Sequence, residues 1–335
     1  MNRPPSPFSM LLSKHTRRRD FIAGLGGVAL LPLTARAQSV EGMRRIGVLV
    51  LGNPDPEPFL KELRNGLQKL GHVDGRTIQF EVRSAAGKAS ALPDAAADLV
   101  RLKVDIIVAW QTPAATAAKR ATDEIPIVMT AGDPVGTGLV ASLSRPGGNV
   151  TGMDSFGAQL GGKCVELIRD TIPSARRVAI LANATDPFTT SFLAEIEKAA
   201  SSLGVATQKL MRRPNDEFET TFAEIRKNAA DAVIIQPSLL HQAAVDLALK
   251  HRLPSFTINR ALPATGGLMG YAANSAQTVH DLAGYVDRIL KGDKPADLPV
   301  THPTKFELVI NLKTARALGL TIPPTLLARA DEVIE

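Results

Sequence analysis

One pattern of strand, polar tip and helix occurs twice in the chain and constrains the fold more than any other feature. The first copy runs from Asp105 to Met129 and the second from Asp231 to Ile258. Each copy begins with a buried apolar strand, passes through a polar tip into a helix, and ends in a second strand that Pro introduces. Two similar α/β units in one chain predict two similar lobes. Because ligands bind beyond the carboxyl ends of the strands in such sheets, the polar tips predict a cleft between the lobes.

The length of 335 residues is typical of about two domains, and an apolar fraction of 44% is sufficient for two cores. Most of the formal net charge of +6 comes from the first 37 residues, which hold six basic residues and one acidic residue. Subtracting these from the totals of 39 basic and 33 acidic residues leaves a net charge of +1. A nearly neutral remainder lacks the electrostatic footprint that nucleic acid or anionic lipid requires.

The first 37 residues are typical of an export signal. Basic residues precede an apolar stretch from Phe21 to Leu33, which is too short to span a bilayer. Ala35-Arg36-Ala37 then gives the small-x-small pattern of a cleavage site. Arg18-Arg19-Asp20-Phe21-Ile22 matches the core of a twin-arginine signal, and an ordinary Sec signal with an extra arginine is the alternative. Either signal predicts a soluble periplasmic product that begins near Gln38.

Strands and helices alternate with short connections from residue 44 to the C-terminus. This regular alternation predicts a doubly wound parallel sheet in each lobe, and hence the α/β class. The order begins anew after residue 152, so we expect residues 44–152 in the first lobe and 153–268 in the second. Segments often return to an earlier lobe around such clefts, so about 270–300 are expected to complete the first lobe and 303–335 the second. The candidate hinges are Asn149–Ser155, Gly266–Tyr271 and the Pro-rich link near 299–303.

Several strand ends carry a polar residue beside a residue suited to begin a helix. These pairs are Asn53-Pro54, Thr112-Pro113, Asp133-Pro134, Asp186-Pro187 and Pro237-Ser238. An Asp or Thr at the N-cap followed by Pro is good helix-start chemistry, so capping alone explains any one pair as well as binding does. A helix N-terminus also presents free N–H groups and the positive end of the helix dipole, which suit a carboxylate.

The polar tips supply the candidate ligand-binding residues. Gln111, Thr112 and Ala114 could form a carboxylate site at a helix N-terminus, and Asp133 could pair with a ligand ammonium. Both charges of an amino acid would then be bound by one lobe. The candidates that complete the site from other strand ends are Asn53, Trp110, Asn183, Gln236, Ser238, Asn259 and Tyr271.

Sequence signatures of catalysis are absent. The chain has no Gly-x-Ser-x-Gly and no His-Glu-x-x-His motif, and its six histidines lie singly without metal-ligand spacing. Gly136-x-Gly138 does not match the dinucleotide fingerprint. The one cysteine, Cys164, cannot form an internal disulfide, and apolar neighbours at helical spacing favour a buried thiol. These features predict a protein without catalysis, metal or cofactor.

Several longer motifs are specific enough to indicate a family. They are Leu70–Arg76, Thr112–Ala115, Ile125–Val128, Gly132–Val140, Ser144–Gly152, Pro303–Asn311 and Leu326–Asp331. Through them, and through nearly everything from Arg44 onward, the chain resembles the extracytoplasmic substrate-binding proteins of ABC transporters, in the family labelled tryptophan/tyrosine or aromatic-amino-acid binders. The resemblance implies a type I periplasmic-binding fold with two lobes around a hinge, without cofactor or catalysis. It also implies a membrane permease and its ATPase as partners.

The chain departs from similar family members at two places. They often carry a small residue where Trp110 stands and an aromatic-rich loop where this chain has Asn259–Leu262, whereas Tyr271 is retained. Three roles are open for Trp110: it stacks on a ligand, it fills space and so selects a smaller ligand, or it is a core residue.

We expect a monomeric periplasmic receptor that closes on an amino acid or related carboxylate and delivers it to the permease. The alternatives are an exported α/β enzyme, such as a hydrolase or isomerase, and a ligand-sensing partner of a membrane receptor.

Overall fold

A computed structural model describes residues 42–52, 57–213 and 216–335. The predicted export signal and the candidate residue Asn53 lie outside the described residues, so the expectations for them stay predictions. Within the described part of the chain, no helix is long and apolar enough to cross a membrane.

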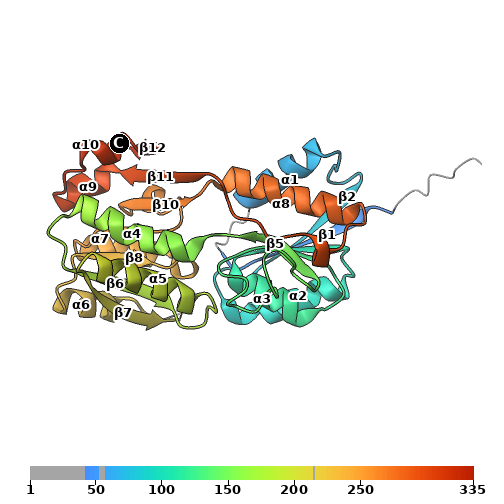
Figure 1. The fold of residues 1–335 in the computed structure, drawn as a ribbon, viewed down its shortest axis with the longest axis horizontal. Helices are drawn as coiled ribbons and strands as arrows, with labels where there is room; N and C mark the ends of the chain where they lie inside the picture. Colours follow the sequence, from blue (N-terminus) through green and yellow to red (C-terminus); the bar gives the residue numbers. More distant parts are fainter. Residues whose placement is uncertain (1–41, 53–56, 214–215) are drawn as a thin grey trace, which may run out of the picture. The chain divides into compact units, whose positions relative to one another are not determined.

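The first lobe is built on a five-stranded parallel sheet in the order β2-β1-β3-β4-β5. Its strands are β1 (Arg44–Val50), β2 (Ile78–Ser84), β3 (Ile106–Trp110), β4 (Ile127–Ala131) and β5 (Val150–Asp154). β3 and β4 consist almost entirely of buried apolar residues, as expected of parallel strands that helices cover on both faces. One face carries α1 (Glu57–Lys69) and α8 (Ser275–Leu290), and the other carries α2 (Leu92–Arg101) and α3 (Thr112–Ala121) (Figure 1).

Two helices far apart in the sequence share one face of this sheet. Leu60, Leu63 and Leu67 recur at helical spacing on α1 and are buried. They join Val279 and Leu282 of α8 in one apolar core with the strands. The first lobe is therefore completed by a segment that follows most of the second lobe along the chain.

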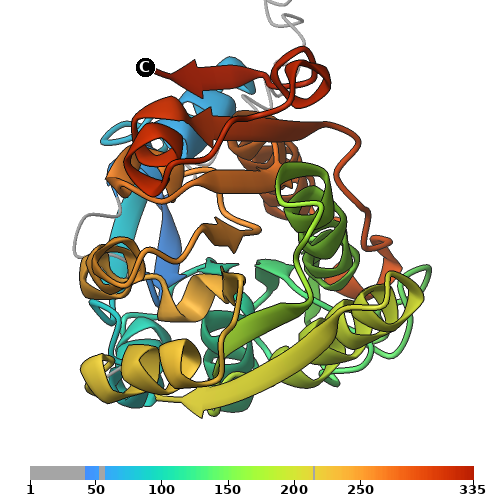
Figure 2. The same cartoon turned by 90° about the vertical axis from the view of Figure 1, so that its left-hand side faces the viewer.

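The second lobe is built on a seven-stranded sheet in the order β12-β11-β10-β9-β8-β6-β7. Its strands are β6 (Arg177–Asn183), β7 (Ala206–Arg212), β8 (Ala232–Ile235), β9 (Ser255–Thr257), β10 (Met269–Ala273), β11 (Phe306–Asn311) and β12 (Glu332–Ile334). On one face lie α4 (Gly157–Thr171), α5 (Thr189–Ser202), α9 (Leu312–Leu318) and α10 (Pro324–Leu327). α6 (Glu219–Lys227) and α7 (Gln242–Lys250) cover the other face (Figure 2).

The second sheet is mixed, whereas the sequence predicted a parallel one. β10 and β11 pair antiparallel, with Ala273 opposite Phe306. The reason is topological: the chain leaves the second lobe for the first after Ala273 and returns from it just before Phe306. Two strands that leave and enter at the same edge of a lobe must run in opposite directions.

The chain passes between the lobes three times. β5 leads to α4 through Ser155 and Phe156, and β10 leads to α8 through the single residue Asn274. The third passage runs from Thr301, which bridges Met153 of the first lobe, into β11. The second crossing therefore lies beyond Gly266–Tyr271, the glycine-rich candidate hinge, because β10 pairs within the second sheet up to Ala273.

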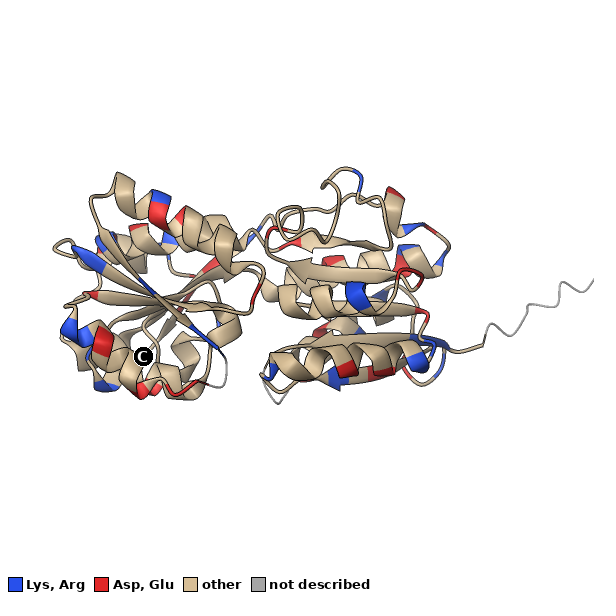
Figure 3. Cartoon of the chain, turned by 90° about the horizontal axis from the view of Figure 1, so that it is seen from below, with Lys and Arg blue, Asp and Glu red and all other residues tan. Residues whose placement is uncertain are grey.

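Two smaller expectations are met by the described residues. Cys164 is 1% exposed and belongs to the core of the second lobe, and burial raises the pKa of its thiol to about 12. Basic and acidic residues are interspersed over the ribbons of both lobes (Figure 3). The even mixture agrees with the nearly neutral charge of the chain after residue 37.

Candidate functional site

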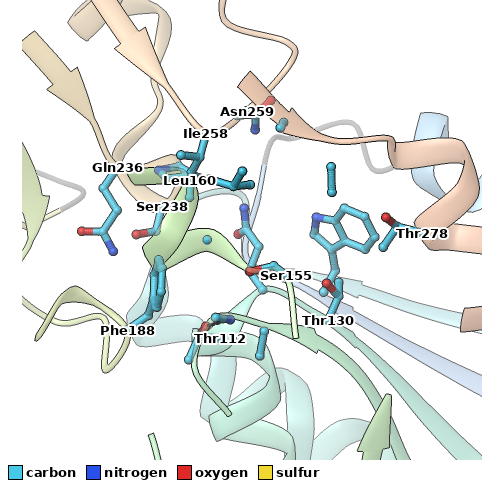
Figure 4. A pocket seen from close by; sticks show the side chains of 18 of the residues that line it. Thr112, Thr130, Ser155, Leu160, Phe188, Gln236, Ser238, Ile258, Asn259 and Thr278 are labelled. Carbon is cyan, nitrogen blue, oxygen red and sulfur yellow. Dashed lines mark hydrogen bonds between the residues drawn. The ribbon is translucent and has the colours of Figure 1, made fainter. Parts of the chain in front are cut away.

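A cavity lies at the carboxyl ends of both sheets, where the sequence repeat predicted a cleft. It encloses about 890 Å³, part of which is open to solvent. The first lobe contributes the ends of β3 and β4 with the residues that follow them, and the second lobe contributes the residues after β6, β8 and β9. Figure 4 shows Thr112 and Thr130 on one side of this space and Phe188, Gln236 and Ser238 on another.

The structure brings together six of the eleven candidates from the sequence. These wall residues are Trp110, Gln111, Thr112, Gln236, Ser238 and Asn259. Four further candidates, Ala114, Asp133, Asn183 and Tyr271, are described by the structure but are not among the residues of the cavity wall. A ligand-binding role for any of the eleven residues stays a prediction.

Two of the candidates outside the wall have packing roles. Ala114 is fully buried in the core between α3 and the first sheet. The Tyr271 ring stacks on Phe306, with the ring centroids 6.1 Å apart, on the strand pair β10–β11. Both side chains are therefore engaged with neighbours of their own lobe.

Asp133 joins the two lobes. Its Oδ1 accepts a hydrogen bond from the Gly136 N–H at 2.9 Å, and its Oδ2 accepts one from the Ser191 hydroxyl on α5. The preceding residue makes a second contact between the lobes, because a Cβ added at Gly132 would lie 2.4 Å from ring atoms of Phe188. Only glycine allows this approach of the two lobes. The structure thus places Asp133 in an inter-lobe contact rather than in the cavity wall.

Gln111 is held in a strained backbone conformation at the start of α3. Its φ of 76° and ψ of 154° are sterically unfavourable for a residue with a Cβ. Its N–H donates to the Thr130 carbonyl at 2.9 Å, and its carbonyl accepts from the Ala115 N–H at 3.1 Å. Its Oε1 is buried and has no hydrogen-bond partner among the described residues. Strain of this kind costs on the order of 1–3 kcal/mol and is concentrated at ligand-binding sites.

The neighbouring Thr112 links α3 to the adjacent strand. Its side chain is buried, and its Oγ1 accepts a hydrogen bond from the Gly132 N–H at 2.9 Å. This bond fixes the N-terminal turn of α3 beside the residue that contacts Phe188. Thr112 therefore links the cavity wall of the first lobe to the inter-lobe contact through this hydrogen bond.

The second lobe contributes a connected polar network. Gln236 is fully buried: its Oε1 accepts from the Asn183 N–H and the Thr189 hydroxyl, both at 2.9 Å. Its Nε2 donates to Asp186 Oδ2 at 3.0 Å, and the Ser238 hydroxyl donates to the same oxygen at 2.8 Å. Asn183 supports the arrangement by donating from Nδ2 to Ser238 Oγ at 3.2 Å.

Asp186 is a wall residue that sequence reasoning missed. The pair Asp186-Pro187 is equally well explained by capping or by binding from the sequence, and Asp186 is not among the eleven candidates; it does accept the Phe188 N–H at 3.0 Å. It is also 7% exposed and lines the cavity. Burial raises the pKa of Asp186, opposed by hydrogen bonds from Ser238, the Phe188 N–H and Gln236. The available signal was its position, an Asp-Pro pair after a strand of the second lobe that mirrors Asp133-Pro134 of the first.

Apolar side chains from both lobes form the rest of the wall. Trp110 packs against Phe59 of α1 with ring centroids 4.5 Å apart, and other parts of Trp110 border the cavity. Leu160, Phe188 and Ile258 of the second lobe also border it (Figure 4). Trp110 is thus both a core residue and a wall residue.

Among the described residues, Arg260 is the one cation that borders the cavity, and two acidic residues lie beside it. Arg260 Nη2 bonds Glu332 Oε2 at 2.9 Å. Arg260 Nε lies 2.9 Å from Glu307 Oε2, although not in hydrogen-bonding geometry. These partners largely balance the charge of the guanidinium. Among the described residues, no group of three or more His, Cys, Asp or Glu side chains is arranged to hold a metal ion.

The two sheets, the three crossings and the cavity between strand ends define the type I periplasmic-binding fold. Residues 50–334 match the family described as ABC transporter substrate binding protein, and the chain belongs to this family. The chain is similar to the tyrosine-binding protein of Clostridioides difficile (strain R20291). The identity is 25% over 283 residues, which cover 83% of this chain and 81% of the relative.

Two solved structures are similar along nearly their whole length. One is the ABC domain in complex with L-Trp from Streptococcus pneumonia, with 27% identity and a TM-score of 0.80. The other is a conserved domain protein from Vibrio cholerae, with 26% identity and a TM-score of 0.81. Each match covers 87% of this chain and 99% of the other chain. The predicted family, the predicted α/β fold and the role as a substrate-binding protein of an ABC transporter are confirmed.

Proposed function

We propose that this substrate-binding protein is a monomer that captures an amino acid in the periplasm and delivers it to an ABC permease and its ATPase. The observation that carries the ligand class is the start of α3 in the cavity wall, where Gln111 has a strained backbone at the helix N-terminus. A relative that binds tyrosine and a similar structure in complex with L-Trp support the same class.

The first lobe suits the ligand carboxylate. α3 begins at Thr112 in the cavity wall, so the partial positive charge of the helix N-terminus faces the cavity. Among the described residues that line the cavity, those of the first lobe carry no side-chain charge. A carboxylate there meets hydrogen-bond donors without meeting a repelling anion.

The apolar wall suits the side chain of the amino acid. Trp110 on one lobe and Leu160, Phe188 and Ile258 on the other border the same space. Since Trp110 is braced against Phe59, its ring is a fixed surface rather than a mobile one. It limits the size of the ligand side chain and offers an aromatic face to it.

Closure of the two lobes on the ligand is part of the proposal, and the contact of Gly132 with Phe188 tests it. Ligand binding in such proteins shifts the population from open to closed forms. Gly132→Ala places a methyl group against the Phe188 ring, and overpacking of this kind costs roughly 1–3 kcal/mol. We expect affinity to fall about ten- to a hundredfold, measured by isothermal titration calorimetry, with little change in the unfolding free energy of the open protein.

Gly148→Ala is the matched control, because nothing lies within 4 Å of a Cβ at that position. The second mutation Phe188→Ala in the Gly132→Ala background should recover part of the lost closure in small-angle scattering with saturating ligand. Equal affinity for the parent and the Gly132→Ala protein would argue against lobe contact in the bound state.

The function itself is tested by a thermal-shift screen of the chain from Gln38 onward against the twenty amino acids and a set of small carboxylic acids. Ligand at a hundredfold of its Kd stabilises a protein by roughly 2.7 kcal/mol, which is readily detected. Stabilisation by one or a few amino acids supports the proposal, and stabilisation by none of them contradicts it. Chemical conversion of a bound compound would favour the enzyme alternative, and binding without ATP-driven uptake would favour the sensing alternative.

A further inference from the structure

The second lobe places one buried carboxylate in the cavity wall without a cation beside it. Asp186 is 7% exposed, and its three partners are neutral donors: the Phe188 N–H, the Gln236 amide and the Ser238 hydroxyl. Among the described residues, no lysine, arginine or histidine forms an ion pair with it. Burying an ionised carboxylate is costly unless a charge of opposite sign accompanies it.

The surrounding groups are arranged for an ionised Asp186. Gln236 cannot turn its amide to present an acceptor there without breaking its bonds to Asn183 and Thr189. All three neutral partners donate to Asp186, which favours the charged form of the carboxylate. A carboxylate has about four acceptor positions, so three donors leave room for another hydrogen bond.

Arg260 does not supply the missing charge. It lines the same cavity, but its guanidinium is paired with Glu307 and Glu332. Two further buried or half-buried acids lie near the cavity. Asp133 accepts from the Gly136 N–H and the Ser191 hydroxyl, and Asp154 accepts from the Phe156 N–H and lies 3.7 Å from His302 Nδ1. Of these three acids, Asp186 is the one that borders the space that a ligand would fill.

We propose that Asp186 is the residue that binds the ammonium group of the ligand, so that the substrates of this protein are primary amines as well as carboxylates. The proposal rests on the function proposed above and deepens it. The two lobes then divide the ligand between them: the first lobe binds the carboxylate at α3 and the second lobe binds the ammonium at Asp186. It replaces the sequence-based suggestion that one lobe binds both charges.

Three probes that share the same side chain separate the contributions of the carboxylate and the ammonium to binding. They are L-tryptophan, tryptamine, which lacks the carboxylate, and indole-3-propionate, which lacks the ammonium. L-Leucine with its amine and its des-amino acid forms a second set for a cavity that Trp110 makes too small for indole. Calorimetry with the parent protein should show that removal of the ammonium lowers affinity about ten- to a hundredfold, as expected for a charge-assisted hydrogen bond.

Asp186→Asn should lower affinity for the amino acid by the same factor and leave affinity for the des-amino acid unchanged or higher. Asp133→Asn is the matched control: it weakens an inter-lobe contact, so any loss should be equal for the amino acid and the des-amino acid. If Asp186→Asn changes affinity for both probes by one factor, Asp186 is structural and the proposal is wrong. If Asp133→Asn instead removes the discrimination between the two probes, the ammonium belongs at Asp133.

A pH titration of the parent protein keeps the proposal testable even if Asp186→Asn fails to fold. Protonation of Asp186 removes its charge, so affinity for tryptamine and for isoamylamine should fall as the solution is acidified. Affinity for an amine that is constant with pH down to the acid unfolding transition would overturn the assignment. The outcome for the proposed function is read separately: a parent protein that binds amines but no amino acid refutes the amino-acid function and keeps the Asp186 assignment.

Discussion

Gln111 and Gln236 are the same residue type at corresponding places of the two lobes, and their surroundings are opposite. Each directly follows a central strand, β3 or β8, and each lines the cavity. Gln236 has an ordinary extended backbone, with φ of −64° and ψ of 136°, and both ends of its amide are bonded. Gln111 has a strained backbone, and its Oε1 is unpartnered among the described residues.

The difference shows two ways of preparing a binding surface. In the second lobe the polar groups satisfy one another, so Asp186 and Ser238 are held in place without ligand. In the first lobe the structure keeps a buried amide oxygen without a partner among the described residues and a strained backbone, costs that contact with the ligand offsets in the proposed function. Substitution at Gln236 should therefore reduce stability, and substitution at Gln111 should reduce affinity.

The largest expected effect is the loss of stability on Gln236→Leu. The change leaves the buried Asn183 N–H without its partner and removes one of three donors to Asp186. Each unsatisfied buried group costs about 1–3 kcal/mol, so the unfolding free energy should fall by about 2–4 kcal/mol in urea titrations. Gln68→Leu on the exposed side of α1 is the control and should change stability by less than about 0.5 kcal/mol. Similar values for the two variants would remove the distinction between Gln236 and an ordinary surface residue.

A smaller effect, opposite in sign, is expected on replacing Gln111 with glycine. Relief of roughly 1–3 kcal/mol of backbone strain outweighs the roughly 0.5–1 kcal/mol entropic cost of glycine. The unfolding free energy should therefore rise by about 1 kcal/mol, while affinity falls about tenfold because the amide is lost. Gln111→Ala keeps the strained backbone and loses the amide, so it should lose affinity and be less stable than the glycine variant. If the alanine and glycine variants are equally stable, the backbone at residue 111 is not strained in solution.

The smallest effect concerns the pH dependence of stability without ligand. Burial raises the pKa of Asp186 above its ordinary value of 3.8. The folded protein then binds this proton more tightly than the unfolded chain does, so the contribution of Asp186 is fully present below about pH 3.8 and is lost as pH rises through the raised value. The stability of the parent relative to Asp186→Asn should therefore decline across that window in urea titrations at successive pH values. A relative stability that rises with pH would mean that the hydrogen bonds to Asp186 lower its pKa by more than burial raises it.

Most of the fold could be predicted because its elements have long periodic patterns. The apolar period predicts a helix over Pro58–Leu70, which is observed at Glu57–Lys69, and the apolar run predicts a strand over Phe306–Asn311, which is observed with the same bounds. α10 and β12 were not predicted, because four and three residues are too few for a period to show. The antiparallel pairing of β11 depends on which lobe the chain comes from, and no local pattern carries that information.

The candidate site was harder to predict, because a polar residue at a strand end can point in several directions. Gln111 and Gln236 follow central strands of their sheets, and both line the cavity. Asp133 and Asp186 have the same local sequence, Asp-Pro after a strand, yet the first meets the other lobe and the second borders the cavity. The difference arises from how the lobes face each other, which is a tertiary property. The residue type at a single position does not determine how the lobes face each other.

The three passages of the chain between the lobes also determine how costly closure is. One passage is the single residue Asn274, whose side chain caps α8 through the Gln277 N–H while its own N–H bonds the Lys305 carbonyl of another passage. Bodies tethered at three points, two of them tied to each other, cannot tumble independently as beads on a string would. Three connections, two of them hydrogen-bonded to each other, restrict the relative motion of the lobes in the proposed closure. Because less entropy is lost in ordering the two lobes, more of the free energy of ligand contact contributes to affinity.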